Sequence, residues 1–183
     1  KIENQANKTD EQKYIELWTI GLHYADRNKK TAERYFLASA KYNKEGYASI
    51  GNLYYFHGEK EKGIKKYEEG YAKGDMRSAY VLGAAYDQEG NLEKAMYWYE
   101  KGAEGGNVLA QFKLALSYEQ LNDEKLSEKW YLRAAEQDYV DAQYNLGNLY
   151  VRKKEYEKAK KWYLEAIKQG DIKSKNNLGA VYL

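Results

Sequence analysis

The sequence contains no cysteine and no proline, and only two histidines, among its 183 residues. Without cysteine there is no disulfide and no cysteine-ligated metal site. The absence of proline removes the residue that most often breaks helices, which favours an all-helical chain whose turns use glycine and asparagine. His23 and His57 stand far apart, so we expect no metal site and no cofactor.

Long apolar runs and an excess of charge are also missing. No run of 18 apolar residues occurs, so we expect no membrane span. The 30 basic and 28 acidic side chains leave a net charge of +2, which argues against a general nucleic-acid or membrane-surface binder. Because the chain opens on Lys1, we expect a removed leader or a trimmed sequence. The compartment stays unknown, with the periplasm or secretion slightly favoured over the cytoplasm.

No arrangement of residues indicates catalysis. The sequence has no Gly-x-Ser-x-Gly, no phosphate-binding glycine loop and no cysteine to pair with histidine. We therefore expect no catalytic residue and no enzyme. A basic cluster begins at Arg152 and is interleaved with glutamates at helical spacing, which favours a solvated helix face. A contact patch for an anionic partner is the alternative for this cluster.

What the sequence does contain is a repeat with a step of 32 residues. The repeated tyrosines are Tyr54, Tyr86, Tyr118, Tyr150 and Tyr182, each preceded three positions earlier by a small residue: Gly51, Gly83, Ala115, Gly147 and Gly179. A second series with the same step is Tyr67, Tyr99, Tyr131 and Tyr163. A fixed period of this length is typical of stacked repeats, which usually bind a partner.

One repeat, residues 77–106, predicts helix A over 77–88, a tight turn, and helix B over 92–104. Glycine, asparagine or, with some strain, lysine ends helix A in the left-handed region: these residues are Gly58, Gly90, Asn122 and Lys154. The equivalent residues after helix B are Gly74, Gly106, Asp138 and Gly170. Asp75, Asn107 and Asp171 follow three of them and are expected to cap the next helix.

The small residue inside helix A needs a physical reason, because glycine there costs about 1 kcal/mol relative to alanine. We expect close approach of helix B, with Gly102, Ala134 and Ala166 as the facing residues. Alanine at position 115 indicates that side-chain volume is the constraint. The tyrosines of both series are expected in the core, since an apolar ring with a polar tip suits a thin helical layer.

Two segments resemble a known family. Residues 142–150 read Ala-Gln-Tyr-Asn-Leu-Gly-Asn-Leu-Tyr, and residues 129–137 read Lys-Trp-Tyr-Leu-Arg-Ala-Ala-Glu-Gln. Both are similar to the Sel-one-like repeat family, a branch of the tetratricopeptide superfamily, although the Gly-x-Gly-Val insertion common in its turns is missing. The resemblance covers roughly residues 12–183. It implies an all-α fold: a right-handed α-α superhelix, or solenoid, of about five helix-turn-helix repeats plus a terminal half repeat.

The domain organisation follows from the period. We expect an N-terminal tail over 1–11 and a single solenoid over 12–183, with units near 12–43, 45–74, 77–106, 109–138 and 141–170 and a half unit at 172–183. The first unit is irregular, which suits an N-terminal cap. The half unit has no helix B to cover it, so we expect the native chain to continue or this helix to pack on a partner or another copy.

The resemblance implies a non-enzymatic scaffold that binds a protein or peptide segment in a concave groove lined by the A helices. The candidate partner-binding residues are Asn52, Tyr55, Tyr80, Asp87, Phe112, Glu119, Tyr144, Asn148 and Asn176. Mixed aromatic, asparagine and acidic groups suit peptide recognition, and the acids favour a neutral or basic segment. Alternatively, the rings at 80, 112 and 144 only pack between adjacent A helices.

Two other functional classes stay open. One is an envelope- or glycan-directed binding module, which includes a secreted host-interaction factor; binding of glycan fragments would support it. The other is a reader of single-stranded nucleic acid, as some helical repeats are. The weak net charge counts against this reading, and an affinity that falls steeply with salt would revive it.

Overall fold

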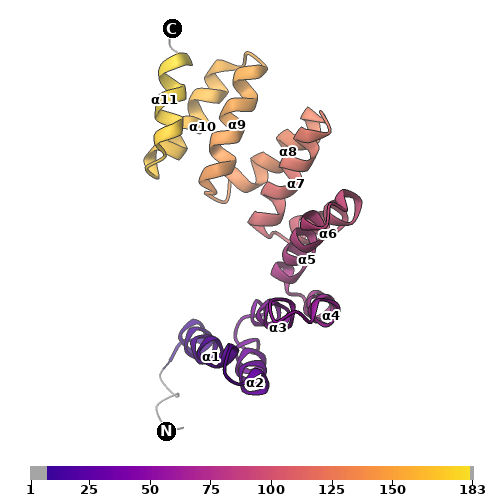
Figure 1. Cartoon of the computed structure of the whole chain (residues 1–183). Helices are drawn as coiled ribbons and strands as arrows, with labels where there is room; N and C mark the ends of the chain where they lie inside the picture. The colour runs from indigo at the N-terminus through magenta and orange to yellow at the C-terminus, as the bar shows by residue number, and fades with distance from the viewer. Residues whose placement is uncertain (1–7, 182–183) are drawn as a thin grey trace. The chain divides into compact units, whose positions relative to one another are not determined.

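A computed structural model describes residues 8–181, and over that range the chain forms eleven helices and no strand (Figure 1). The helices are α1 (Asp10–Ala25), α2 (Lys29–Ser39), α3 (Gly46–Tyr55), α4 (Lys60–Ala72), α5 (Met76–Gln88), α6 (Leu92–Glu104), α7 (Val108–Gln120), α8 (Glu124–Ala135), α9 (Val140–Arg152), α10 (Tyr156–Lys168) and α11 (Ile172–Val181). The first ten form five helical hairpins, and α11 occupies the A-helix position of the repeat. The predicted all-α repeat solenoid is confirmed.

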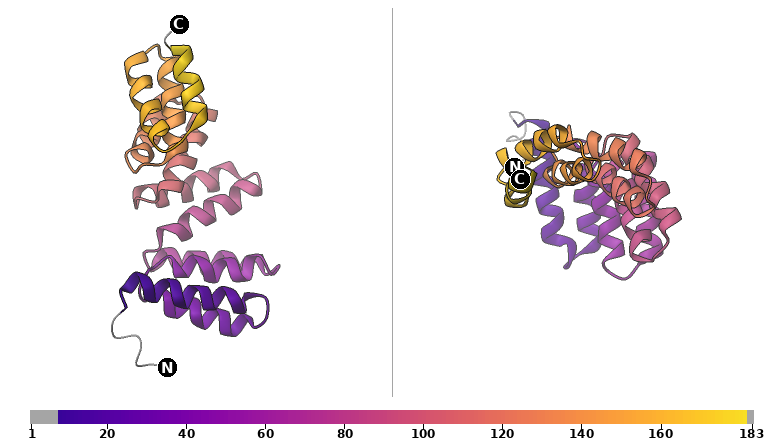
Figure 2. Two further views of the ribbon diagram at one scale, coloured as in Figure 1. Left: turned by 90° about the vertical axis from the view of Figure 1, so that its left-hand side faces the viewer. Right: turned by 90° about the horizontal axis from the view of Figure 1, so that it is seen from above.

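The chain divides into two compact units, Lys1–Gly102 and Ala103–Leu183. The boundary falls in the last turn of α6, so unit 1 contains α1 to α5 and most of α6, while unit 2 contains α7 to α11. In unit 2, α10 packs against both α9 and α11, and the three helices lie side by side in both views of Figure 2.

Left-handed residues end the helices at the predicted places. The φ angles are +74° at Gly90, +58° at Asn122 and +59° at Lys154. The next amide donates back into the helix, as from Glu155 N to the Tyr150 carbonyl at 2.8 Å. This bond satisfies a carbonyl that the helix end would otherwise leave without a partner. The lysine therefore takes the strained conformation that the repeat position demands.

The predicted helix caps are also present. Asn107 Oδ1 accepts the Ala110 amide at 2.9 Å, and Asp171 Oδ2 accepts the Ser174 amide at 2.7 Å. At the start of α1, Thr9 Oγ1 accepts the Gln12 amide while Gln12 Oε1 accepts the Thr9 amide. This reciprocal cap starts α1 at Asp10, inside the range expected to be a tail.

The glycine inside each of the helices α3, α5 and α9 makes room for a tyrosine ring of the following helix B. Tyr67, Tyr99, Tyr131 and Tyr163 are all at most 1% exposed. A Cβ added to Gly83 would lie 2.6 Å from Tyr99 Cε1, and one added to Gly147 would lie 2.6 Å from Tyr163 Cδ1. The expected close approach of helix B is present, and the group of helix B that lies against Gly83 is the Tyr99 ring. The ring needs the volume that a side chain on helix A would take.

The other tyrosine series is only partly in the core. Tyr54 and Tyr150 are buried, whereas Tyr86 and Tyr118 are half-buried. Tyr182 lies outside the described residues. The Tyr150 hydroxyl donates to Glu128 Oε1 at 2.8 Å, so its burial leaves no unsatisfied polar group.

Consecutive hairpins are joined by buried polar groups. In unit 1, Asp75 is 1% exposed, and it accepts the Ala48 amide at 2.8 Å, the Ser78 hydroxyl at 2.6 Å and the Arg77 amide at 2.9 Å. In unit 2, Gln143 Nε2 donates to the Ala135 carbonyl at 3.2 Å. These bonds connect each A helix to an element of the preceding hairpin, and they set the stacking within each unit.

Candidate functional site

Each group of predicted binding residues surrounds one buried tyrosine. In the second hairpin, the Tyr67 hydroxyl donates to Asn52 Oδ1 at 2.5 Å. The ring of Tyr55 packs against that of Tyr67 with centroids 6.2 Å apart. Tyr55 and Asn52 are both half-buried. The predicted pair therefore covers the buried ring on one side and meets solvent on the other.

The third hairpin repeats this arrangement with a carboxylate. Tyr80 stacks on Tyr99, with centroids 6.1 Å apart and ring planes 30° from parallel. The Tyr99 hydroxyl lies 3.4 Å from Asp87 Oδ2, a long hydrogen bond. Burial, and then the nearby Asp87 carboxylate, raise the pKa of Tyr99, so the phenol stays protonated.

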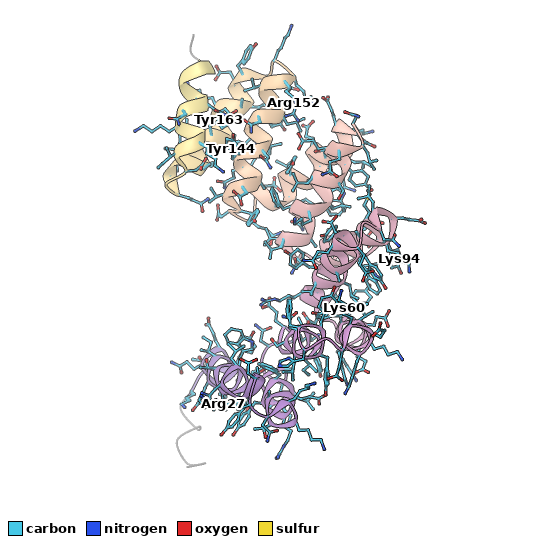
Figure 3. The ribbon with its side chains drawn as sticks, viewed as in Figure 1. Arg27, Lys60, Lys94, Tyr144, Arg152 and Tyr163 are labelled. Carbon is cyan, nitrogen blue, oxygen red and sulfur yellow. The ribbon has the colours of Figure 1, made fainter. Side chains whose placement is uncertain are left out.

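In unit 2, the fourth hairpin adds an ion pair. Phe112 lies 5.9 Å from the Tyr131 ring and 5.0 Å from the Tyr139 ring, measured between centroids. The Tyr131 hydroxyl donates to Glu119 Oε2 at 2.6 Å, and burial and Glu119 raise the pKa of Tyr131. Arg152 lies in the last turn of α9 (Figure 3). Its guanidinium pairs with the other oxygen of Glu119. The acid that was expected to favour a basic ligand is thus already neutralised by an arginine.

The fifth hairpin joins the candidate face to α11. Tyr144 and Tyr163 lie together, with centroids 6.4 Å apart (Figure 3). Asn148 Oδ1 accepts the Tyr163 hydroxyl at 2.7 Å and Asn177 Nδ2 at 2.8 Å. The predicted Asn176 is exposed on α11 and takes no part in these contacts.

One rule explains the acceptors on this face. A buried phenol needs a hydrogen-bond acceptor, and helix A supplies it one or four positions after its small residue. The acceptors are Asn52, Asp87, Glu119 and Asn148. The first hairpin tests the rule, because there the ring beside Gly21 is Phe36, which has no hydroxyl. The corresponding positions hold Leu22 and Ala25, which have no side-chain acceptor.

The half-exposed rings have a different role. Tyr80, Phe112 and Tyr144 each pack on the helix B tyrosine of their own hairpin. They therefore do not only pack between adjacent A helices, as the alternative interpretation had it. Each ring is half-buried, so part of it is open to a partner.

Sequence reasoning missed two polar residues of this face, Arg152 and Asn177. Arg152 was assigned to a solvated basic cluster, and its neighbours do fit that assignment. Lys153 pairs with Glu128, and Lys158 with Glu155, both at 2.5 Å. The partner of Arg152 lies on α7, far away in the sequence, so only the packed hairpins reveal the contact.

Over residues 8–181, no group of three or more histidine, aspartate or glutamate side chains is placed to hold a metal ion. Within the same range, none of the helices combines the length and apolar character needed to cross a membrane.

Family comparisons agree with this geometry. Sequence models of the tetratricopeptide repeat match residues 48–108 and 140–169, and the model of the Sel1 repeat matches residues 108–139. The chain is a Sel1-like, tetratricopeptide-related repeat protein. Such families are generally non-enzymatic interaction scaffolds. No curated protein matches the sequence significantly.

Solved structures share the fold at low sequence identity. Pseudomonas aeruginosa PilF superposes with a TM-score of 0.59 at 14% identity, over 88% of this chain and 78% of that chain. MamA from Desulfovibrio magneticus RS-1 gives 0.51 at 16%, over 85% and 94%. YrrB, described as a TPR protein with an unusual peptide-binding site, gives 0.54 at 18%, over 100% and 96%. At these identities the likeness concerns the fold.

Proposed function

We propose that this chain is a non-enzymatic scaffold that binds a protein or peptide segment on the exposed side of its A helices. The observation that carries the proposal is the recurrence of a half-exposed ring on each buried tyrosine. The rings are Tyr55 and Tyr80 in unit 1, and Phe112 and Tyr144 in unit 2. A ring held in place by the core binds with little loss of side-chain freedom, which is the behaviour of binding hot spots.

Charge refines the proposed ligand. Asp87 is exposed, whereas Glu119 is paired with Arg152. Unit 1 therefore offers a carboxylate to a basic group of the ligand, and unit 2 offers a neutral polar surface. A ligand segment with a basic residue suits the surface of unit 1, and an uncharged segment suits the surface of unit 2. Neither surface favours a segment that ends in a free carboxylate.

A pull-down from the source cell, followed by titration of the captured protein, tests the proposal. Tyr80→Ala and Phe112→Ala each remove a half-exposed ring without emptying a buried position. Each is expected to weaken binding by about 1–3 kcal/mol, which is roughly a fivefold to 150-fold loss of affinity. Far-UV circular dichroism should show unchanged helicity.

A matched control comes from an exposed ring on a B helix. Tyr97 is 53% exposed on α6. Tyr97→Ala should leave the affinity unchanged. If this control weakens binding as much as Tyr80→Ala and Phe112→Ala do, the A-helix face is not the binding surface.

The alternatives give different results in the same assay. A glycan-directed module would bind cell-wall glycan fragments through these rings in the absence of any protein partner. A reader of single-stranded nucleic acid would bind oligonucleotides with an affinity that falls steeply as salt is added. Either result would replace the protein-scaffold proposal.

We also propose self-association through α11. Gly179 occupies the repeat position against which a helix B tyrosine ring packs in other hairpins, yet no atom lies within 4 Å of a Cβ built there. The space beside Gly179 would accommodate an aromatic ring from a second copy of the chain. Sedimentation velocity should then show a concentration-dependent dimer that Gly179→Arg abolishes. A constant monomer mass would exclude it.

A further inference from the structure

A second surface in unit 1 has the features of a binding pocket. A cavity of about 650 Å³ lies between α2, α3 and α4. Its apolar lining comes from Leu37, Tyr47, Ile50 and Ala72. Leu37 is 49% exposed, so an apolar side chain faces open space at the cavity wall. A cavity of this size accommodates one or two bulky side chains of a ligand.

Part of the charged rim is internally satisfied. Lys66 Nζ lies 3.7 Å from Glu33 Oε1 and 3.0 Å from Glu69 Oε2. Glu33 Oε2 also accepts the Tyr54 hydroxyl at 2.6 Å. These three charged residues hold one another in place, and because Lys66 offsets one of the two carboxylates, they leave one negative charge at the rim.

The remaining rim charges are all positive and have no partner. Arg34 and Lys73 line the cavity, are exposed, and form no ion pair or hydrogen bond with another described side chain. Unpaired cations beside an apolar cavity attract a ligand that joins an apolar body to negative charge.

We propose that this cavity, the α2–α4 pocket, binds an acidic peptide segment through one or two bulky apolar side chains flanked by carboxylates. The apolar side chains enter between Leu37 and Tyr47, and the carboxylates meet Arg34 and Lys73. The pocket shares no residue with the candidate face of the A helices. The protein would then carry two binding surfaces with different charge preferences.

Three synthetic peptides test this proposal on the full chain. Each has a central Leu-Phe pair, flanked on both sides by two aspartates, two serines or two lysines. Titrations followed by amide NMR chemical shifts should place the aspartate peptide at α2, α3 and α4. Its dissociation constant should be at least tenfold lower than that of the lysine peptide, with the serine peptide between them.

Reversing the charge of two residues that line the pocket gives a sharper test. The double variant Arg34→Glu, Lys73→Glu should exchange the order, so that the lysine peptide binds more tightly than the aspartate peptide. The matched control is Lys30→Glu, Lys65→Glu, which makes the same charge change on exposed residues of α2 and α4 outside the pocket. The control should keep the original order, and Leu37→Ser should weaken all three peptides.

Several outcomes would overturn the proposal. Shifts confined to residues outside α2–α4, or equal affinity for all three peptides, would remove the pocket or its charge preference. Dodecanoate bound at the pocket when no peptide binds would assign it to small amphiphiles instead. Tyr80→Ala should leave peptide binding here unchanged, so failure of the A-helix proposal and failure of this one are distinguishable.

Discussion

Two glycines at the same repeat position should respond oppositely to the same substitution. Replacing glycine by alanine inside a helix gains about 1 kcal/mol of helix propensity. At Gly179 no atom lies within 4 Å of the new Cβ, so Gly179→Ala should raise the free energy of unfolding by up to that amount. At Gly83 the new Cβ would lie 2.6 Å from Tyr99 Cε1, so the ring must move.

The size of the second effect follows from overpacking. Forcing a methyl group into a filled core costs about 1–3 kcal/mol. Subtracting the propensity gain leaves Gly83→Ala roughly neutral to 2 kcal/mol less stable than the parent. The two alanine variants should therefore differ by about 1–3 kcal/mol, and Gly83→Leu should be less stable than either.

Urea unfolding followed by far-UV circular dichroism measures these differences. Ala115 is a useful reference, because it is fully buried and shows that this chain already accepts a methyl group at the same repeat position. A double-mutant cycle of Gly83→Ala with Tyr99→Leu isolates the contact, since a smaller apolar side chain should relieve the alanine penalty. Equal stabilities for Gly83→Ala and Gly179→Ala, or a cycle without coupling, would refute the assignment of the glycine to ring packing.

Three further predictions concern polar groups and the backbone. Asp75→Asn should lower stability by about 1–3 kcal/mol, because an amide keeps only one acceptor oxygen. Burial raises the pKa of Asp75 above its usual value of 3.8, although the hydrogen bonds to the carboxylate act in the opposite direction. The folded state therefore binds this proton more tightly than the unfolded state, so the free energy of unfolding of the parent, relative to that of Asp75→Asn, should fall as the pH rises above 3.8. Urea titrations at several pH values measure this difference. Tyr131→Phe should lower the free energy of unfolding by about 1 kcal/mol. The double variant Tyr131→Phe, Glu119→Ala should lose less stability than the sum of the two single variants, which a double-mutant cycle measures. Lys154→Gly should raise the thermal midpoint and Gly90→Lys should lower it, since a lysine at positive φ is strained by about 1 kcal/mol.

The local parts of the fold could be predicted from the sequence. The hairpin boundaries, the left-handed residues Gly90 and Lys154, and the caps Asn107 and Asp171 all depend on neighbours within a few residues. The period also placed the helix B tyrosines in the core, because a thin helical layer offers few other positions for so many rings. The assignment to the repeat family depends on these same local features.

The candidate site was predicted less completely. Asn52, Asp87, Glu119 and Asn148 were chosen as ligand contacts, and the structure shows that each also accepts a buried tyrosine hydroxyl. A signal was present in the sequence, because the hairpin with Phe36 in place of tyrosine lacks such acceptors. Their partner-binding role stays a prediction.

The sequence by itself determined the hairpin, its period and the residues that turn the chain, because each of these is decided by backbone preferences over a few positions. Tertiary packing decided what the repeat positions contact: the Tyr99 ring beside Gly83, Arg152 beside Glu119, and the cavity between α2, α3 and α4. These contacts join residues that are distant in sequence and sit on separate helices. Helix periodicity says which face a residue occupies, whereas the neighbour on that face depends on how the helices pack.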